Sequence, residues 1–332
     1  MAAIGQGNLT LLDLARAKNP DGSIASVVEL LTKDNPLLED MVWKEGNLDT
    51  GELVTFRSGL PAITWRRLNE GVAATKGDTA QYVETCGLMS GLSKIDVKLA
   101  ELGGNAPAVR AGQDRAFITA MNVELENAIF YSSTKTNPEK IMGLAPRFDT
   151  KSIWTNQVIS STAGGAPSGT NQTSIWLVVW GDDKVYGVTP KGTQAGIEMI
   201  DRGQQLVRDV PGNEFFAWVT EFNWRAGLVV KDPRYVVRIG DIRVTGGTLA
   251  GTGSALLQNM ASALERVKDL GGRPAFYCNR TIREYLRLQA LDTSKTSMLN
   301  ITTNVGSRPV LMFDEVPVRR SDSILNNEAA LS

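Results

Sequence analysis

The sequence predicts an α+β protein with a compact body and long extended projections, and three observations support this fold class. Segment 51–102 alternates apolar and polar residues with the period of two that is typical of strands. Segment 109–133 contains no proline and repeats apolar residues at helical spacing, which predicts a helix about twice the usual length. Segment 254–290 has the pattern of a helix, a short strand and a second helix.

The composition excludes several classes of enzyme. The chain has 332 residues, with 35 Lys and Arg against 36 Asp and Glu, a formal net charge of −1 and no histidine. Without histidine there is no Ser-His-Asp or Cys-His catalytic group and no zinc site that uses imidazole. Cys86 and Cys278 lie far apart in the sequence, which predicts two reduced thiols rather than a metal cluster or a disulfide framework. We therefore expect no cofactor and no metal ion.

The sequence does not indicate a membrane protein. The longest apolar run, 175–180, has six residues, whereas a helix that crosses a bilayer needs about 18. The N-terminus has neither the basic region nor the apolar region of a secretory signal. We expect a protein that is made inside the cell and does not enter a membrane.

The first 50 residues are a distinct piece, with four basic and eight acidic side chains. Within them, Ile24, Val27 and Leu31 recur at helical spacing, which predicts a short helix. A helix this short is marginal alone, so its apolar face must lie against the rest of the chain or against a neighbouring copy. These three residues are therefore candidates for an assembly interface.

The alternating segment predicts a long β-hairpin. Its alternating runs are 53–58, 63–68, 79–85 and 94–99, and turn sequences lie between the middle runs. Arms of about 20 extended residues reach about 65 Å, which is well beyond the radius of a compact domain. Because an isolated hairpin is only marginally stable in water, we expect a partner surface to support this one.

The hairpin carries the remaining interface candidates, which are Trp65, Arg66, Arg67, Lys76 and Asp78. Neighbours on a strand point to opposite faces, so Arg66 and Arg67 would serve two different surfaces, as in an element held between partners. The alternative, an exposed strand with two solvated arginines, is equally consistent with the sequence.

The long helix after the hairpin has a defined start, because Asn105 is a candidate N-cap and Pro107 is tolerated in the first turn. Ser254 and Asn279 are expected to cap the two helices of the 254–290 unit. Strands are expected at 175–180, 215–222, 226–230, 234–239 and within 309–324.

Three further patterns, a glycine-rich segment, a group of acidic residues and the basic pairs, could indicate a binding or catalytic site, but each also has a purely structural interpretation. The glycine-rich segment 246–254 precedes a helix, but it lacks the lysine of a phosphate-binding loop, which favours a linker. Asp182, Asp183 and Glu198 could form a carboxylate site or bind a cation, although adjacent aspartates are more typical of an exposed turn. The basic pairs have no interleaved aromatic residues, and at a net charge of −1 we expect no sequence-specific nucleic-acid binding.

The order of these pieces resembles the major capsid proteins of tailed bacteriophages with the Hong Kong 97-type fold. The resemblance covers most of the chain and rests on the hairpin 50–102, the helix 109–133 and two specific stretches. Residues 221–235 read EFNWRAGLVVKDPRY, and residues 313–325 read FDEVPVRRSDSIL. Both stretches look like the short-tailed-phage branch of the family.

The resemblance implies a domain division and a set of partners. It divides the chain into an N-terminal arm at 1–49, an extended loop at 50–104, a mainly peripheral domain at 105–245 with its spine helix at 109–133, a mainly axial domain at 246–308 and C-terminal strands at 309–332. Pentamers and hexamers of the chain would form an icosahedral shell around double-stranded DNA. Scaffolding, portal and decoration proteins would be separate chains. The protein would be located in the virion after assembly in the bacterial host cytoplasm.

Some relatives join a lysine and an asparagine covalently, and Lys76 lies near the hairpin tip, but an ordinary solvated lysine is favoured. The chain has no evident set of catalytic residues, and its extended segments lack a supporting surface within the chain. Both observations are consistent with a protein whose contacts are supplied by copies of itself. A near-neutral charge fits a wall that encloses DNA without binding it tightly. Two alternatives stay open: an encapsulin-like protein compartment, and an α+β hydrolase that uses Asp182, Asp183 or Glu198.

Overall fold

A computed structural model of the chain describes residues 35–102, 105–149, 154–161, 171–209, 212–245, 248–249, 254–291, 299–302 and 310–331. The predictions for Ile24, Val27 and Leu31 lie outside the described residues, as does most of the glycine-rich segment 246–254.

The described elements are those of an α+β protein, as expected. The helices are α2 (Pro36–Asp40), α3 (Val97–Leu102), α4 (Ala106–Tyr131), α5 (Ser254–Arg266) and α6 (Arg280–Leu291), with short 3-10 helices at Thr155–Gln157 and Pro233–Tyr235. The strands are β1 (Trp43–Glu45), β2 (Gly51–Gly59), β3 (Asp78–Thr85), β4 (Gly87–Asp96), β5 (Val158–Ser160), β6 (Gln172–Trp180), β7 (Val185–Thr189), β8 (Glu198–Arg208), β9 (Glu214–Val230), β10 (Val236–Thr245), β11 (Thr248–Leu249), β12 (Arg273–Cys278), β13 (Leu299–Thr302), β14 (Val310–Phe313) and β15 (Val316–Arg320).

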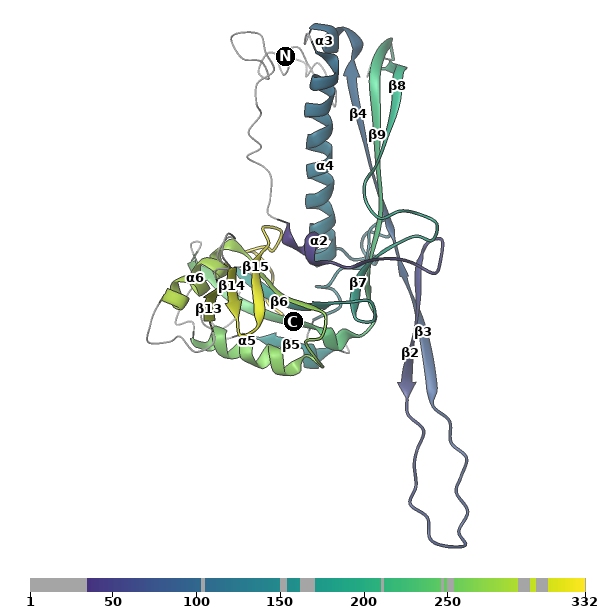
Figure 1. The fold of residues 1–332 in the computed structure, drawn as a ribbon, viewed down its shortest axis with the longest axis vertical. Helices are drawn as coiled ribbons and strands as arrows, with labels where there is room; N and C mark the ends of the chain where they lie inside the picture. The colour runs from purple at the N-terminus through teal and green to yellow at the C-terminus, as the bar shows by residue number, and fades with distance from the viewer. Residues whose placement is uncertain are drawn as a thin grey trace.

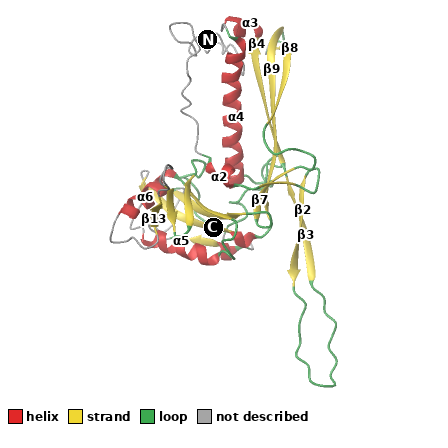
Figure 2. Cartoon of the chain, viewed as in Figure 1, coloured by secondary structure: helices red, strands yellow, loops and turns green. Residues whose placement is uncertain are grey.

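The described chain has three parts of different shape (Figure 1). A compact lobe contains α5, α6 and the C-terminal strands. The long helix α4 rises from this lobe beside the narrow sheet of β4, β8 and β9. The hairpin of β2 and β3 points in the opposite direction and ends in a loop far from the lobe (Figure 2).

The hairpin is shorter than expected. β2 and β3 pair antiparallel from Gly51 with Thr85 to Gly59 with Asp78, and residues 60–77 between them form no strand. The expected strand at 63–68 is therefore wrong. It has no partner strand opposite: the limb at 70–75 contains Gly71, Ala73 and Ala74, residue types with low strand propensity.

The strand after the hairpin belongs to a different sheet. β4 leaves β3 at Cys86 and pairs with β9 over ten residue pairs, from Gly87 with Ala226 to Asp96 with Ala217. The expected run at 94–99 is divided, because residues from Val97 onward form helix α3. The alternation predicts the strand β4 but not its partner, because strand pairing depends on residues that are distant in the sequence.

Helix α4 is the spine-length helix that the sequence predicts. Asn105 caps it, with its side-chain oxygen accepting the Ala108 N–H at 3.3 Å, and Pro107 lies in the first turn. Its 26 residues extend about 39 Å. One face packs on the narrow sheet, where the Phe117 and Phe222 rings stack with centroids 5.4 Å apart. Gly91 leaves little room there, since a Cβ would lie 3.0 Å from the Phe117 ring, which would have to shift by a few tenths of an ångström.

The lobe is built around β6, whose nine residues are all buried, as expected for a central strand. β10 and β12 pair antiparallel with β6 on its two sides, and β15 extends the sheet parallel to β12. Buried residues of α5 and α6 join this core, among them Met260 and Leu286. Asn279 caps α6 as expected, accepting the Ile282 N–H at 2.9 Å.

Strand β9 connects the lobe with the narrow sheet. The expected strands at 215–222 and 226–230 form one continuous strand of 17 residues. Its first part pairs with β4 and β8, and its last part pairs with β7, from Gly227 with Val188 to Val230 with Val185. The domain boundaries at residues 49, 104, 245 and 308 stay predictions. β6 and β10, which precede residue 245, lie in one sheet with β12.

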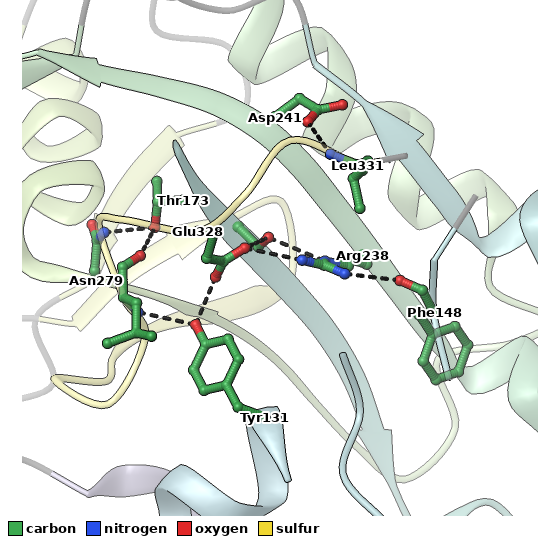
Figure 3. A network of polar contacts seen from close by, with 10 residues as sticks. Tyr131, Phe148, Thr173, Arg238, Asp241, Asn279, Glu328 and Leu331 are labelled. Atoms are coloured by element: carbon green, nitrogen blue, oxygen red, sulfur yellow. Dashed lines mark hydrogen bonds and ion pairs between the residues drawn. The ribbon is translucent and has the colours of Figure 1, made fainter. Parts of the chain in front are cut away.

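The C-terminal segment ties α4 to the lobe through a buried polar network (Figure 3). The Tyr131 hydroxyl, at the end of α4, donates to Glu328 Oε1 at 2.6 Å, and Arg238 Nη2 on β10 binds Glu328 Oε2 at 3.0 Å. Tyr131 also accepts the Leu325 N–H at 3.0 Å. One carboxylate thus joins the helix to the sheet. Among the described residues, no helix is long and apolar enough to cross a membrane.

Candidate assembly interface

The loop at 60–77, called the tip loop below, displays large apolar side chains without covering them. Trp65 is exposed over its whole surface, at 103% of the reference area, and Ile63 and Leu68 are almost as exposed. Soluble monomers rarely expose a contiguous group of large apolar side chains, and such groups usually mark interaction sites. The exposed apolar side chains therefore indicate that the tip loop is an interaction site.

The tip loop has a defined turn at its end. Arg66 Nη1 donates to the Glu70 carbonyl oxygen at 3.2 Å, and the Arg67 N–H donates to Glu70 Oε2 at 3.3 Å. Asn69 has the left-handed φ of 68° that such a turn requires and that asparagine tolerates. Thr75 Oγ1 donates to the Ala62 carbonyl at 2.9 Å and joins the two limbs.

The structure brings some of the candidate residues together and separates others. Trp65, Arg66 and Arg67 lie at the turn with exposed side chains, and Lys76 and Asp78 are exposed on the returning limb, where β3 begins. Residues 65–67 are not in a strand, so strand alternation does not place Arg66 and Arg67 on opposite surfaces. The role of all five residues in assembly stays a prediction.

The root of the hairpin, in contrast to its tip, is held firmly. Glu52 and Glu84 lie directly opposite each other on β2 and β3, and both are buried. Two carboxylates in this position repel each other unless each has its own partner. The Tyr186 hydroxyl donates to Glu52 Oε1 at 2.6 Å, and the Arg147 guanidinium binds both oxygens of Glu84, with Nη2 and Oε2 2.6 Å apart.

A third anchor of the root is Tyr82, whose hydroxyl donates to the Val230 carbonyl at 2.6 Å. Burial raises the pKa of Tyr82 to about 12, and burial also raises the pKa of Tyr186. Both phenols therefore stay protonated and able to donate at neutral pH. Sequence reasoning missed these anchors. The one signal for them was an acidic residue near the root end of each strand, Glu52 at the start of β2 and Glu84 near the end of β3.

The carboxylates considered for catalysis do not form a cluster. Asp183 is exposed on the turn after β6, where its Oδ1 binds Lys231 Nζ at 2.7 Å, and this bond lowers the pKa of Asp183. Glu198 starts β8 opposite Asn223. Asn223 and Lys231 are eight residues apart, which is about 26 Å of extended backbone, so the partners of the two acids lie at different points along the sheet. Within the described residues, no group of three or more His, Cys, Asp or Glu side chains could hold a metal ion.

The two cysteines are free thiols. Cys278 is fully buried, and burial raises its pKa to about 12. Burial likewise raises the pKa of Cys86 to about 11. Both are therefore protonated at neutral pH, and a protonated thiol is a poor nucleophile.

Comparison with known proteins identifies the family. The family model described as major capsid protein GP7 matches residues 19–332 of the chain. The chain belongs to the major capsid protein GP7 family. No curated protein sequence matches this capsid protein.

One solved structure agrees with the family assignment, and a more distant one shares the fold. A structure of bacteriophage epsilon15 shares 32% sequence identity, with a TM-score of 0.79 over 100% of this capsid protein and 99% of that chain. The capsid of bacteriophage JBD30 has the same fold at 10% identity, with a TM-score of 0.51 over 89% of this chain and 93% of that one. The SrpI encapsulin of Synechococcus elongatus PCC 7942 aligns with a TM-score of 0.46 at 11% identity.

These findings confirm the resemblance to phage capsid proteins of the Hong Kong 97 type and the α+β fold expected from it. They also confirm the general function: the chain is a shell-forming capsid protein of a phage virion. The extended tip loop is then a part of a subunit whose neighbours are copies of itself.

Proposed function

We propose that copies of this capsid protein assemble, through the tip loop and its supporting hairpin, into an icosahedral shell of pentamers and hexamers that encloses the double-stranded DNA of a tailed phage. The observation that carries the proposal is the contrast between the two ends of the hairpin. Its root is anchored by buried charges and hydrogen bonds, whereas Trp65 at its tip is uncovered. A hairpin that is anchored at its root and exposes apolar side chains at its tip is suited to contact with a neighbouring subunit.

The charges support enclosure rather than tight binding of DNA. The net charge of −1 gives little electrostatic attraction to phosphates, since affinity for DNA grows with the number of phosphates neutralised. In this proposal the protein is not an enzyme, and it uses neither a cofactor nor a metal ion. Scaffolding, portal and decoration proteins are separate chains, and the shell is assembled in the host cytoplasm.

In this proposal the hairpin, the tip loop and β4 fall within the extended loop at 50–104, and α4 with β8 and β9 belongs to the peripheral domain. The lobe is the axial domain. Segment 246–308 supplies its two helices, while β6 and β10 contribute from the earlier segment because they pair in the same sheet. The arm at 1–49 and the strands at 309–332 complete the subunit.

Electron microscopy of the purified full chain tests the proposal directly. We expect closed shells with icosahedral symmetry at high protein concentration. A monomer that stays monodisperse at that concentration would contradict the proposal. The encapsulin alternative is tested on particles recovered from the native source. A nucleic-acid absorbance spectrum supports a genome-containing capsid, and a protein spectrum with an enclosed second protein supports a compartment.

A further inference from the structure

A small apolar pocket lies beside α4, where β4 begins and the turn at 139–141 passes. Its wall is formed by Leu88, Met89, Leu125, Ala128, Ile141 and Ala226. The volume is about 140 Å³. A cavity of about 150 Å³ lined by apolar side chains can hold one benzene ring, so this pocket, called the α4 pocket below, has room for one aromatic ring.

The rim of the α4 pocket is acidic. Glu124, Glu139 and Lys140 lie there, and Lys140 Nζ is bound to Glu124 Oε1 at 2.7 Å. Glu139 Oε1 accepts a hydrogen bond from Asn137 Nδ2 at 3.3 Å, but within the described residues it has no ion pair with a cation. The pocket is also reachable from outside, since the Leu88 side chain in its wall is 57% exposed.

The tip loop has the complementary chemistry. Trp65, an exposed aromatic side chain, is followed directly by Arg66 and Arg67. Residues 60–77 carry three basic and one acidic side chain. An aromatic anchor beside arginines is the type of residue that dominates binding at protein interfaces. An apolar pocket with an acidic rim is a suitable receptor for it.

The tip loop cannot reach the α4 pocket of its own chain. The hairpin leaves the centre of the molecule in the direction opposite to α4, and the tip loop lies beyond its end (Figure 1). The nine residues of β2 alone separate the loop from the hairpin root by about 30 Å. The Trp65 that enters a given pocket must therefore come from a second copy.

The chain's own segment 1–34 is a less suitable occupant. It contains no Phe, Trp or Tyr, and it carries three basic and four acidic side chains. It therefore offers no aromatic ring that the pocket volume would fit, and its net charge is negative, whereas that of the tip loop is positive.

We propose that Trp65 of one subunit inserts into the α4 pocket of a neighbouring subunit, with the adjacent arginines facing Glu139. This inference rests on the proposed function, because it requires subunits to meet in a shell. It goes further by assigning the receptor site of the tip loop.

Disulfide crosslinking in assembled particles tests the contact while keeping Trp65 and both arginines. In a Cys86→Ala background, Thr64→Cys is combined with Leu88→Cys. Thr64 is exposed beside Trp65, and Leu88 is in the pocket wall. Because a disulfide forms only when the two Cα atoms are about 4.4–6.8 Å apart, it reports close approach. The matched control combines Thr64→Cys with Asp182→Cys, on the exposed turn after β6.

We expect particles of the Thr64→Cys/Leu88→Cys variant to give reducible covalent multimers, and the control particles to give none. The inference is overturned if particles form without these multimers, or if the control crosslinks equally well. It is also overturned if Leu12→Cys with Leu88→Cys crosslinks within single chains, since segment 1–34 then fills the pocket. If the unaltered chain forms no particles at all, the proposed function itself fails, which is a distinct result.

Assembly measurements give an independent test. We expect Trp65→Ala to raise the protein concentration needed for assembly by about tenfold or more, as for the loss of a central aromatic anchor. Val72→Ala, which removes another exposed apolar side chain of the tip loop, should change it far less. Replacing Arg66→Glu and Arg67→Glu should impair assembly, and Glu139→Lys should restore part of it. Equal effects of Trp65→Ala and Val72→Ala, or no restoration, contradict the inference.

Discussion

Arg147 and Glu84 form a two-point ion pair at the root of the hairpin, with Nη2 and Oε2 2.6 Å apart and side-chain exposures of only 15% and 6%. Arg147 also donates to the carbonyl oxygens of Met142 and Gly143, at 3.0 and 3.2 Å. The guanidinium therefore joins β3 to the turn that follows α4. This contact connects the hairpin with the segment that carries Ile141 in the wall of the α4 pocket.

We expect Arg147→Met to destabilise the protein by about 3–5 kcal/mol, because Glu84 is left as a buried charge without its partner. The free energy of unfolding in urea measures this. The double variant Arg147→Met/Glu84→Gln should recover part of the loss, since no unpaired charge stays buried. Lys98→Ala, which breaks the exposed pair with Glu101, should cost less than about 1 kcal/mol. A double variant as unstable as the sum of its single variants contradicts this prediction.

The Tyr82 anchor predicts a stability change at high pH. The phenol pKa is raised from its usual 10.0 to about 12 by burial and by the nearby Glu84 carboxylate. A raised pKa favours the protonated form in the folded protein, so the stabilisation is complete below pH 10 and is lost as the pH rises toward about 12. Unfolding measured between pH 8 and pH 12 should show this loss.

Tyr82→Phe is the control for that prediction. It removes the hydrogen bond to Val230, which should cost about 0.5–1.5 kcal/mol at neutral pH. It also removes the titrating group, so the fall in stability above pH 10 should be smaller than in the unaltered protein. Identical pH profiles of the two proteins would show that Tyr82 does not carry the effect.

The C-terminal network predicts a coupling between α4 and the lobe. In Glu328→Gln, Arg238 loses its buried carboxylate and Tyr131 loses a charged acceptor, which we expect to cost about 1.5–3 kcal/mol. Amide hydrogen exchange should become faster at the end of α4, near Tyr131. The exposed neighbour Asn327→Ala should leave both stability and exchange unchanged. Unchanged exchange in Glu328→Gln would mean that the network does not hold the helix.

Removal of the returning limb of the tip loop separates folding from assembly. Deletion of residues 69–78 should leave a folded subunit, because the buried Glu52 and Glu84 and the half-buried Tyr82, which anchor the root, lie outside the deletion. The subunit should fail to form closed shells. Circular dichroism and electron micrographs measure the two properties. Normal shells from this variant would contradict a role of the tip loop in assembly.

Local signals in the sequence were sufficient for several elements. The asparagine cap and proline at residues 105–107 define the start of α4, and the unbroken apolar run at 175–180 identifies a strand buried on both faces. These features depend on neighbouring residues or on the total hydrophobicity of a short segment. They could therefore be recognised before any partner strand was known.

The pairing of strands and the receptor of the tip loop depend on distant residues. Runs 63–68 and 94–99 alternate as clearly as 79–85, yet the first forms no strand and the second divides between β4 and α3. The outcome depends on the segment that lies opposite, which is the limb at 70–75 for the first run and the distant strand β9 for the second. Glu84 and Arg147 are 63 residues apart in the sequence, and no sequence pattern links two residues at that distance.

Periodicity, capping residues and the absence of histidine were enough to establish the α+β class, the long helix and the lack of a histidine-based active site, because each is a property of short-range order or of composition. Strand partners, the buried anchors of the hairpin and the pocket beside α4 were decided by tertiary structure. They arise when segments far apart in the chain pack together, and the packing energy of those contacts outweighs local preference.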